Sequence, residues 1–110
     1  MAVIFTEDEE RKLYAGMYFI FKGFTLLDDV NTALFERMDV DNEIEKKEIK
    51  KFFEMILKIS EARARIDDEY IYTEDETEAE RREKIEDEIS EWIEDNVFND
   101  KLKTLLSIKD

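Results

Sequence analysis

The chain contains no proline and only two glycines among its 110 residues, and this shortage restricts the folds that it can adopt. Strands joined by tight turns usually need both residues, because proline fixes the backbone of a turn and glycine tolerates positive φ angles. Helices need neither. The sequence therefore predicts an all-α fold. We expect a compact bundle of four to five helices with one long central helix, forming a single domain over residues 1–110.

The first helix has recognisable start and stop signals. Thr6 and Glu9 have the spacing of a capping box, in which each side chain accepts a hydrogen bond from the backbone of the other residue. We expect the helix to follow this box and to run to about Lys22, with Gly23 as the left-handed residue that ends it. A short second helix is then expected to begin at Thr25 and to continue to about residue 38.

A long third helix is predicted by side chains that recur at alternating steps of three and four positions. We expect Asp41 to cap it and Tyr70 to end it, because the segment 70–72 favours an extended backbone. A charge at Arg63 is costly unless it is paired, so this side chain either reaches solvent or forms an ion pair across a symmetric interface. The row comprises Ile49, Phe52, Ile56, Ile59, Arg63, Ile66 and Tyr70.

The fourth helix could begin at either of two overlapping capping boxes, which start at Thr73 and Thr77, and the sequence leaves both open. We expect this helix to continue to about Val97. A last short helix would follow, capped by Asn99 or Asp100. The residues expected on one face of the fourth helix are Ile85, Ile89, Trp92, Ile93 and Asn96, of which the first four mark its buried side.

Charge and composition exclude several classes of function. The net charge of −14 argues against direct binding to nucleic acid or to an anionic membrane, since both would repel the chain. The chain has no cysteine and no histidine, so it lacks the thiolate and imidazole groups of most catalytic and transition-metal sites. We therefore expect no catalytic residue, metal or cofactor. No apolar run approaches a membrane span, and we expect a cytoplasmic protein, in the host cell if a phage encodes it.

The negative charge is concentrated in one third of the chain. Residues 67–100 carry 16 acidic side chains and only three basic ones. On the fourth helix, six carboxylates share the side opposite the apolar face, and we call them the acidic stripe: Glu76, Glu80, Glu83, Asp87, Glu91 and Glu94. The preceding acids, which we call the entry segment, would extend this surface: Asp67, Asp68, Glu69, Glu74 and Asp75.

The acidic stripe lowers the stability of its own helix, since each pair of like charges at these spacings costs about 0.2–0.5 kcal/mol. Its carboxylates are spaced roughly 5 Å apart along the helix axis, similar to phosphates along a nucleic-acid strand. A protein that binds phosphates with lysine and arginine could bind this stripe instead. Two other readings stay open. The stripe could serve solubility alone, or it could pair with lysines of the third helix, within the chain or across a dimer: Lys46, Lys47, Lys50, Lys51 and Lys58.

The first helix is apolar around most of its circumference over residues 13–21. Such a helix is either the central helix of a bundle or is covered by a partner. Phe19 points away from the expected core and Tyr18 points sideways, so these two residues, with Arg63, are candidates for an oligomer interface. The chain is therefore a possible homodimer.

The carboxylates also permit a weak comparison with enzymes. The segment Asp87-Glu88-Ile89-Ser90-Glu91 superficially resembles the E-E-x-x-E motif of MazG-type nucleotide pyrophosphohydrolases, which are helical and Mg²⁺-dependent. The second motif of that family, E-x-x-D, does not follow at a helix-length distance, and Ile89 lies on the core face. This makes an enzyme the least favoured reading.

By surface character, the sequence resembles small acidic proteins, often from phages, that mimic nucleic acid and block a nucleic-acid-binding protein of the host. Anti-CRISPR and anti-restriction proteins belong to this class. The resemblance implies an inhibitor that binds a basic protein without catalysing a reaction. The alternative is a helical assembly or adaptor protein, such as a phage morphogenesis chaperone, in which the aromatic first helix would be the binding surface.

Overall fold

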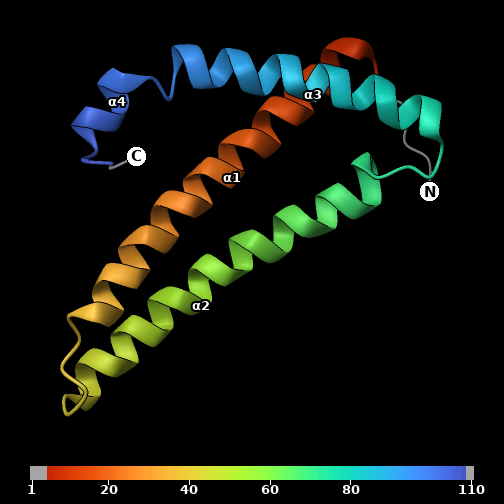
Figure 1. Ribbon diagram of the computed structural model, residues 1–110. Coiled ribbons are helices and arrows are strands. Elements are labelled where there is room, and N and C mark those ends of the chain that lie inside the picture. Colours follow the sequence, from red (N-terminus) through yellow and green to blue (C-terminus); the bar gives the residue numbers. More distant parts are fainter. Residues whose placement is uncertain (1–4, 109–110) are drawn as a thin grey trace. The chain divides into compact units, whose positions relative to one another are not determined.

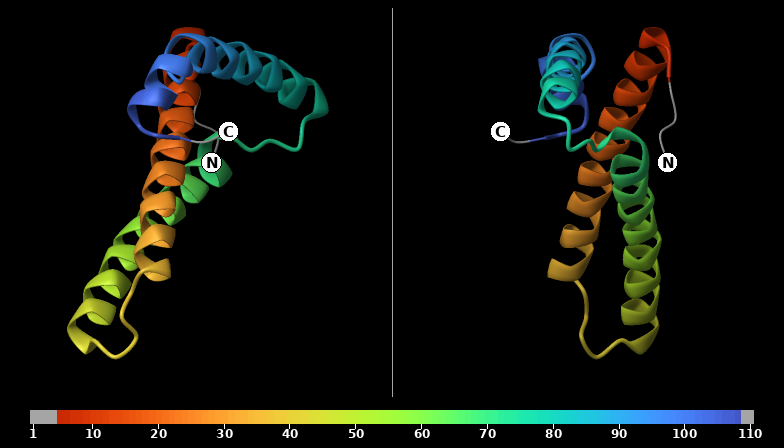
Figure 2. Two further views of the ribbon diagram at one scale, coloured as in Figure 1. Left: turned by 60° about the vertical axis from the view of Figure 1, so that its left-hand side comes forward. Right: turned by 90° about the vertical axis from the view of Figure 1, so that its right-hand side faces the viewer.

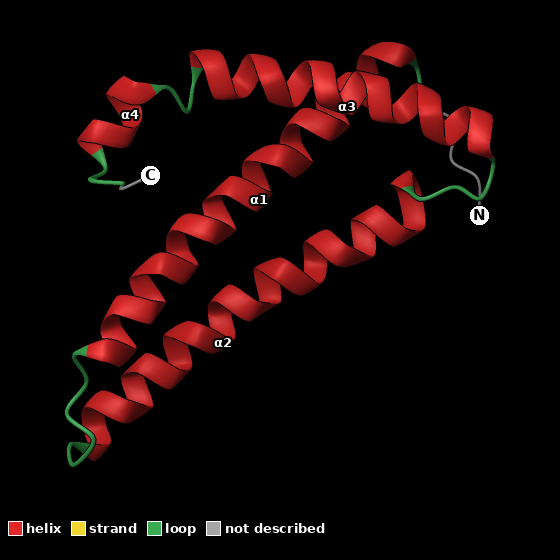
Figure 3. Cartoon of the chain, in the orientation of Figure 1, coloured by secondary structure: helices red, strands yellow, loops and turns green. Residues whose placement is uncertain are grey.

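The computed structural model describes residues 5–108. Within this range the chain consists of helices joined by loops and contains no strand, which confirms the all-α prediction (Figures 1 and 3). None of these helices is both long enough and apolar enough to cross a membrane. The elements in chain order are α1 (Glu7–Glu36), α2 (Glu43–Ile66), the π-helical turn η1 (Asp67–Ile71), α3 (Glu76–Asn96) and α4 (Asp100–Leu105).

Contacts between residues divide the chain into two compact units. One unit extends from Met17 to Tyr72 and contains the second part of α1, all of α2 and η1. The other unit combines the described residues up to Gly16 with those from Thr73 onward, so it contains the first part of α1 together with α3 and α4. Helix α1 therefore contributes to both units.

The first unit is a helical hairpin. A short loop follows α1, and α2 then runs back along the second part of α1 (Figure 2). Met17, Ile49 and Ile56 are buried in the seam between the helices. The guanidinium carbon of Arg63 lies 5.2 Å from the centre of the Phe21 ring, a cation–π contact that joins α2 to α1. Of the expected apolar row of α2, Ile49, Ile56 and Arg63 therefore face α1, whereas Ile59 is 39% exposed.

The expected helix break at Gly23 is wrong, because α1 continues through it without interruption. Gly23 does not adopt a positive φ angle, and the Thr25 hydroxyl donates a hydrogen bond to the carbonyl of Phe21 inside the helix instead of capping a new one. A glycine within a helix costs only about 1 kcal/mol. The apolar residues on both sides of it gain more by staying in one helix that packs along α2.

The start signals of the helices were predicted with mixed success. The capping box of α1 is confirmed, since the Glu9 amide donates to the Thr6 hydroxyl at 3.2 Å and the Thr6 amide donates to Oε1 of Glu9 at 2.9 Å. Asn99 caps α4 by accepting from the Leu102 amide, as one of the two alternatives predicted. The cap of α2, however, is Asn42, which accepts from the Glu45 amide.

The predicted caps of α2 and α3 fail for the same reason. The carboxylate of Asp39 accepts a hydrogen bond from the Asp41 amide, so Asp41 sits inside a turn and its neighbour takes the cap position. Before α3, the Thr73 hydroxyl likewise accepts from the Asp75 amide, and Asp75 caps the helix in place of either threonine. In both loops, a side chain that closes a tight turn shifts the helix start by one or two residues.

The end of the hairpin also differs from the prediction. The segment after Ile66 widens into the π turn η1, in which the Tyr72 amide donates to the carbonyl of Asp67, five residues earlier, at 2.8 Å. Because a π turn holds more residues than an α turn, the apolar row continues at Ile71 instead of Tyr70. Ile71 is buried and Tyr70 is exposed. The extended backbone begins at Tyr72.

The second unit is built on α3 and the first part of α1. Tyr14 of α1 is buried, as are Ile85 and Ile93 of α3, so the apolar face predicted for α3 forms part of this core. Trp92, however, was expected on the buried side and is 62% exposed. It lies at the edge of the apolar face, beside the position of Ile85 around the helix.

Candidate functional site

The acidic stripe follows the solvent-exposed side of α3. Five of its six carboxylates are exposed and Glu94 is half-buried. The orientation of α3 explains this, because its opposite side contributes Ile85 and Ile93 to the core of the second unit. The spacing predicted from the sequence therefore places the stripe on one exposed face of one helix.

The exposed carboxylates of the stripe are not neutralised. Within residues 5–108, the side chains of five members form no salt bridge and no hydrogen bond: Glu76, Glu80, Glu83, Asp87 and Glu91. Ordinary exposed helices place opposite charges three or four residues apart. On this face of α3, the negative charge is left available to another molecule.

The arginines of α3 are engaged on the other side of the helix. Nη2 of Arg81 donates to both carboxylate oxygens of Glu10, at 2.8 and 3.0 Å, and also binds Glu78 within α3. Nε of Arg82 lies 3.3 Å from Glu78. Because Glu10 is buried, it requires this partner, and the arginines are held near the core instead of beside the acidic stripe.

Protonation equilibria reflect this network. The hydrogen bond from Arg81 lowers the pKa of the Glu78 carboxyl, and the bonds to Glu78 and Glu10 raise the pKa of the Arg81 guanidinium. The Tyr14 hydroxyl donates to Oε2 of Glu10 at 3.4 Å, and burial raises the pKa of Tyr14 to about 12. Glu78 and Arg81 therefore stay charged, and Tyr14 stays neutral, over the physiological pH range.

The C-terminal end of α3 adds a second unfavourable charge effect. The last turn carries Glu94 and Asp95 and has no basic residue. Carboxylates at this end of a helix meet the negative end of the helix dipole, whereas cations there are stabilising. The acidic character of α3 is thus retained along its whole length, including the end where the helix itself disfavours it.

The entry segment is divided between the two units. Its first three acids lie on η1 in the hairpin unit, where Glu69 is 3.4 Å from Arg65. Glu74 and Asp75 lie directly before α3 in the second unit and are exposed. Asp75 has a structural role as well, because its Oδ1 accepts hydrogen bonds from the amides of Thr77 and Glu78. Glu74 and Asp75 therefore continue the negative charge beyond the start of α3.

The three aromatic and basic candidates for an oligomer interface have different surroundings. Phe19 is 44% exposed. Tyr18 is half-buried, with Nζ of Lys22 at 5.6 Å from its ring centre and the Phe21 ring at 6.3 Å. Arg63 is half-buried against Phe21, and its Nε lacks a hydrogen-bond partner within the described part of the chain. Its charge is thus held over an aromatic ring and not at the solvent-exposed rim.

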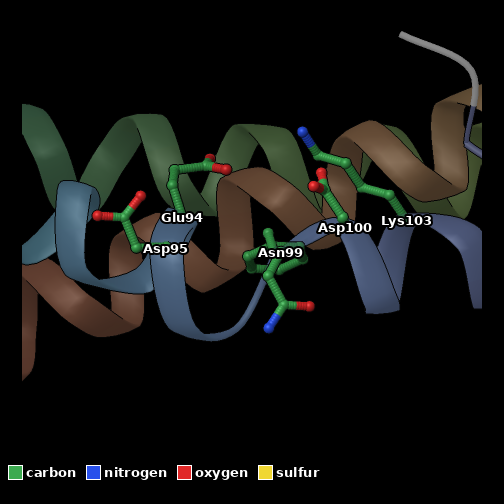
Figure 4. A pocket seen from close by; sticks show the side chains of 6 residues that line it. Glu94, Asp95, Asn99, Asp100 and Lys103 are labelled. Atoms are coloured by element: carbon green, nitrogen blue, oxygen red, sulfur yellow. The ribbon is translucent and has the colours of Figure 1, made fainter.

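An open hollow of ≈ 300 Å³ lies beside the junction of α3 and α4. Figure 4 shows Glu94, Asp100 and Lys103 on one side of this junction and the Asn99 side chain pointing to the other. Among the described residues, no three acidic side chains come close enough to hold a metal ion together. Sequence reasoning missed this hollow because α4 follows α3 through a loop whose path is set by the Asn99 cap.

Comparison with known proteins gives no relative from which a function could be transferred. The sequence matches no protein-family model, and no curated protein or solved structure is significantly similar to it. The acidic stripe and the exposed surfaces of the helices are therefore the basis for any functional conclusion.

Proposed function

We propose that this chain is an acidic binding protein that inhibits a nucleic-acid-binding protein by occupying its basic groove. The observation that carries this proposal is the row of exposed carboxylates on α3 that have no partner within the described residues. Cellular targets of this kind include defence proteins that act on foreign DNA or RNA. The proposal places the chain with anti-CRISPR-like and anti-restriction-like inhibitors of phages and other mobile elements, acting inside the host cell.

The charge density of α3 is comparable to that of a nucleic-acid strand. The helix has 21 residues, of which ten are acidic and three are basic. At a rise of 1.5 Å per residue it is roughly 30 Å long, so it carries about one net negative charge per 4.5 Å. A single strand of B-DNA carries one per 3.4 Å of helix axis. A groove that holds a phosphate backbone could therefore bind α3 with similar electrostatic attraction.

The mechanism would be competitive. Attraction between the acidic stripe and a basic groove speeds association, and the bound helix would then exclude nucleic acid from the same groove. Because the carboxylates are exposed, their attraction is screened by salt. We therefore expect the association rate and the affinity to fall steeply as the salt concentration rises.

The proposal can be tested by capture followed by a charge-matched comparison. The immobilised chain is used to capture proteins from a host lysate at low and high salt, and each captured protein is purified and titrated with the chain and with labelled DNA or RNA. The stripe variant is Glu80→Gln, Glu83→Gln, Asp87→Asn and Glu91→Gln. The control variant removes the same number of exposed acids elsewhere, through Asp29→Asn, Glu48→Gln, Glu54→Gln and Glu61→Gln.

The stripe variant should bind at least tenfold more weakly and show a flatter dependence on salt, whereas the control variant should keep most of its affinity. The wild-type chain should also displace nucleic acid from its target. Equal losses in both variants would show that only the net charge matters. A captured protein that binds both nucleic acid and this chain at once would contradict competition for one groove.

A second candidate function is favoured by the apolar side chains that the hairpin leaves in solvent. Phe19, Val30 and Met55 are each more than 40% exposed, although they lie on helices that form the core of one unit. A helical assembly or adaptor protein would use such residues to bind a partner. In that case Phe19→Ser would abolish binding to the captured protein, and the stripe variant would bind normally.

A further inference from the structure

The hairpin carries an apolar surface that is separate from the acidic stripe. It consists of one row on each helix, and both rows follow the 4-3-4 spacing of helix-packing positions. We call these residues the hairpin face: on α1 Phe19, Gly23, Leu26 and Val30, continued by Ala33, and on α2 Met55, Ile59, Ala62 and Ile66. Neither row contains a charged residue.

The two rows lie on the same side of the hairpin. The seam includes Met17 and Phe24 on α1 and Ile49 and Ile56 on α2. Viewed down each helix from its N-terminus, the row of the hairpin face lies to the same side of these seam residues. When two helices run antiparallel, flanks of the same rotational sense meet on one side of the pair. The rows therefore form one continuous surface, two helices wide.

The opposite side of the hairpin is different, because polar side chains interrupt it. On α1 it includes Thr25, Asp28 and Thr32 between its aromatic residues, and on α2 it includes Lys46 and Ser60. An interface core is depleted of charged groups because their desolvation is costly. Over its length the hairpin face has the apolar character that an interface between helices requires, and on α2 it ends at Lys51 and Glu48, which precede Met55 on the same side of the helix.

Gly23 lies in the middle of the hairpin face. A Cβ atom added there would meet no other atom within 4 Å, so packing within the described chain does not require a glycine. A glycine in the interior of a helix is nevertheless about 1 kcal/mol less favourable than alanine. Small residues of this kind permit another helix to approach closely, and Ala33 and Ala62 add to the effect.

We propose that the hairpin face binds a second copy of this chain, so that two hairpins form a four-helix bundle. The exposed area is sufficient. Phe19, Val30, Met55 and Ile59 are 44%, 49%, 55% and 39% exposed, which leaves roughly 400 Å² of apolar surface at about 200 Å² per large side chain. A stable dimer buries about 800 Å² per partner, roughly two thirds of it apolar. The half-buried Leu26 and Ile66 supply most of the remainder.

Charge also favours a second copy over a charged partner. Residues 17–66 contain ten acidic and nine basic side chains and η1 adds three acids, so the hairpin unit carries a net charge of only −4 out of the −14 of the whole chain, and two hairpins repel each other weakly. A two-fold interface must be complementary to itself, and an uncharged apolar surface satisfies this condition. The proposal is independent of the acidic stripe, which belongs to the other unit.

The test compares two lysine substitutions that are two residues apart on α2. Ile59 lies on the hairpin face and is 39% exposed, and Leu57 lies on the opposite side and is 41% exposed. The molar mass of the full chain is measured by sedimentation equilibrium over a range of concentrations, in about 0.5 M salt to screen the acidic stripe. Circular dichroism checks that each variant remains helical.

We expect the wild-type chain and Leu57→Lys to have twice the 13.3 kDa mass of one chain, and Ile59→Lys to raise the dissociation constant at least tenfold. Gly23→Ala provides a variant that should not unfold the chain, since it fits the isolated hairpin, and it should also weaken the dimer. A wild-type chain that stays at 13.3 kDa at about 100 μM would overturn the proposal, as would equal dissociation of Ile59→Lys and Leu57→Lys.

Discussion

Glu83 provides a direct test of whether the acidic stripe reduces the stability of the protein that carries it. Its charged neighbours at three and four positions along α3 are Glu80, Glu86 and Asp87, all of them acidic. The substitution Glu83→Lys converts three repulsive pairs into attractive ones. At about 0.2–0.5 kcal/mol per pair for each sign, the change amounts to roughly 1–3 kcal/mol before screening, and about 1 kcal/mol at physiological salt.

Glu54 on α2 is the matched control. Its charged neighbours at the same spacings are Lys50, Lys51 and Lys58, so Glu54→Lys converts three attractive pairs into repulsive ones. Both residues are exposed, both substitutions change the net charge equally, and glutamate and lysine have similar helix propensities. We therefore expect opposite shifts: about 1 kcal/mol more stable for Glu83→Lys and about 1 kcal/mol less stable for Glu54→Lys.

The measurement is thermal unfolding followed by circular dichroism, in which 1 kcal/mol corresponds to a shift of about 4–8 °C for a domain of this size. The difference between the two variants should shrink in 1 M salt, where the Debye length falls to about 3 Å. Shifts in the same direction would refute the reasoning, because total charge and not the local row would then govern stability. If Glu83→Lys is more stable but binds its target less tightly, the stripe is retained for binding at the expense of stability.

Three further predictions concern the second unit and α1. In an absorbance titration of phenolate, one of the four tyrosines should titrate with a pKa of about 12, and Tyr14→Phe should remove this late step. Because burial raises the pKa of Tyr14 only in the folded state, the free energy of unfolding should fall as the pH rises from about 10 to about 12. Asp75→Ala should lower the free energy of unfolding in urea by about 1 kcal/mol, because it removes the cap of α3, whereas Asp75→Asn should leave it nearly unchanged. Equal losses of stability in the two variants would show that the charge of Asp75 matters and its cap does not. Gly16→Ala should raise the urea midpoint by the equivalent of about 0.5–1 kcal/mol, since a Cβ atom there meets nothing within 4 Å, and a lower midpoint would contradict this.

The sequence was sufficient to predict elements that depend on local spacing. The capping box of Thr6 and Glu9, the cap at Asn99 as one of two alternatives, and the exposed position of the acidic stripe all follow from residues within one or two turns of each other. The break expected at Gly23 was wrong because local propensity at one residue is weaker than packing along the whole of α1. Local signals therefore identified helices well and their interruptions poorly.

Contacts between distant residues could not be predicted. The ion pair between Glu10 and Arg81 joins positions 71 residues apart, and nothing in the spacing of either segment signals it. The same holds for Trp92, which shares the apolar side of α3 with Ile85 and Ile93 and is nevertheless 62% exposed. A helical wheel gives the direction of a side chain, but not the extent of the surface that covers it.

At the π turn η1, the packing of the hairpin tolerates a change in chain length. Its wider turn accommodates one more residue between Ile66 and Ile71 than an α-helix would. Deleting one residue from this segment would restore regular α-helical geometry and keep the last isoleucine in phase with the seam. Deletion of any one of the acidic residues of η1 would thus leave the apolar contacts of α2 undisturbed. Natural variants of this protein that differ in length by a single residue should differ here.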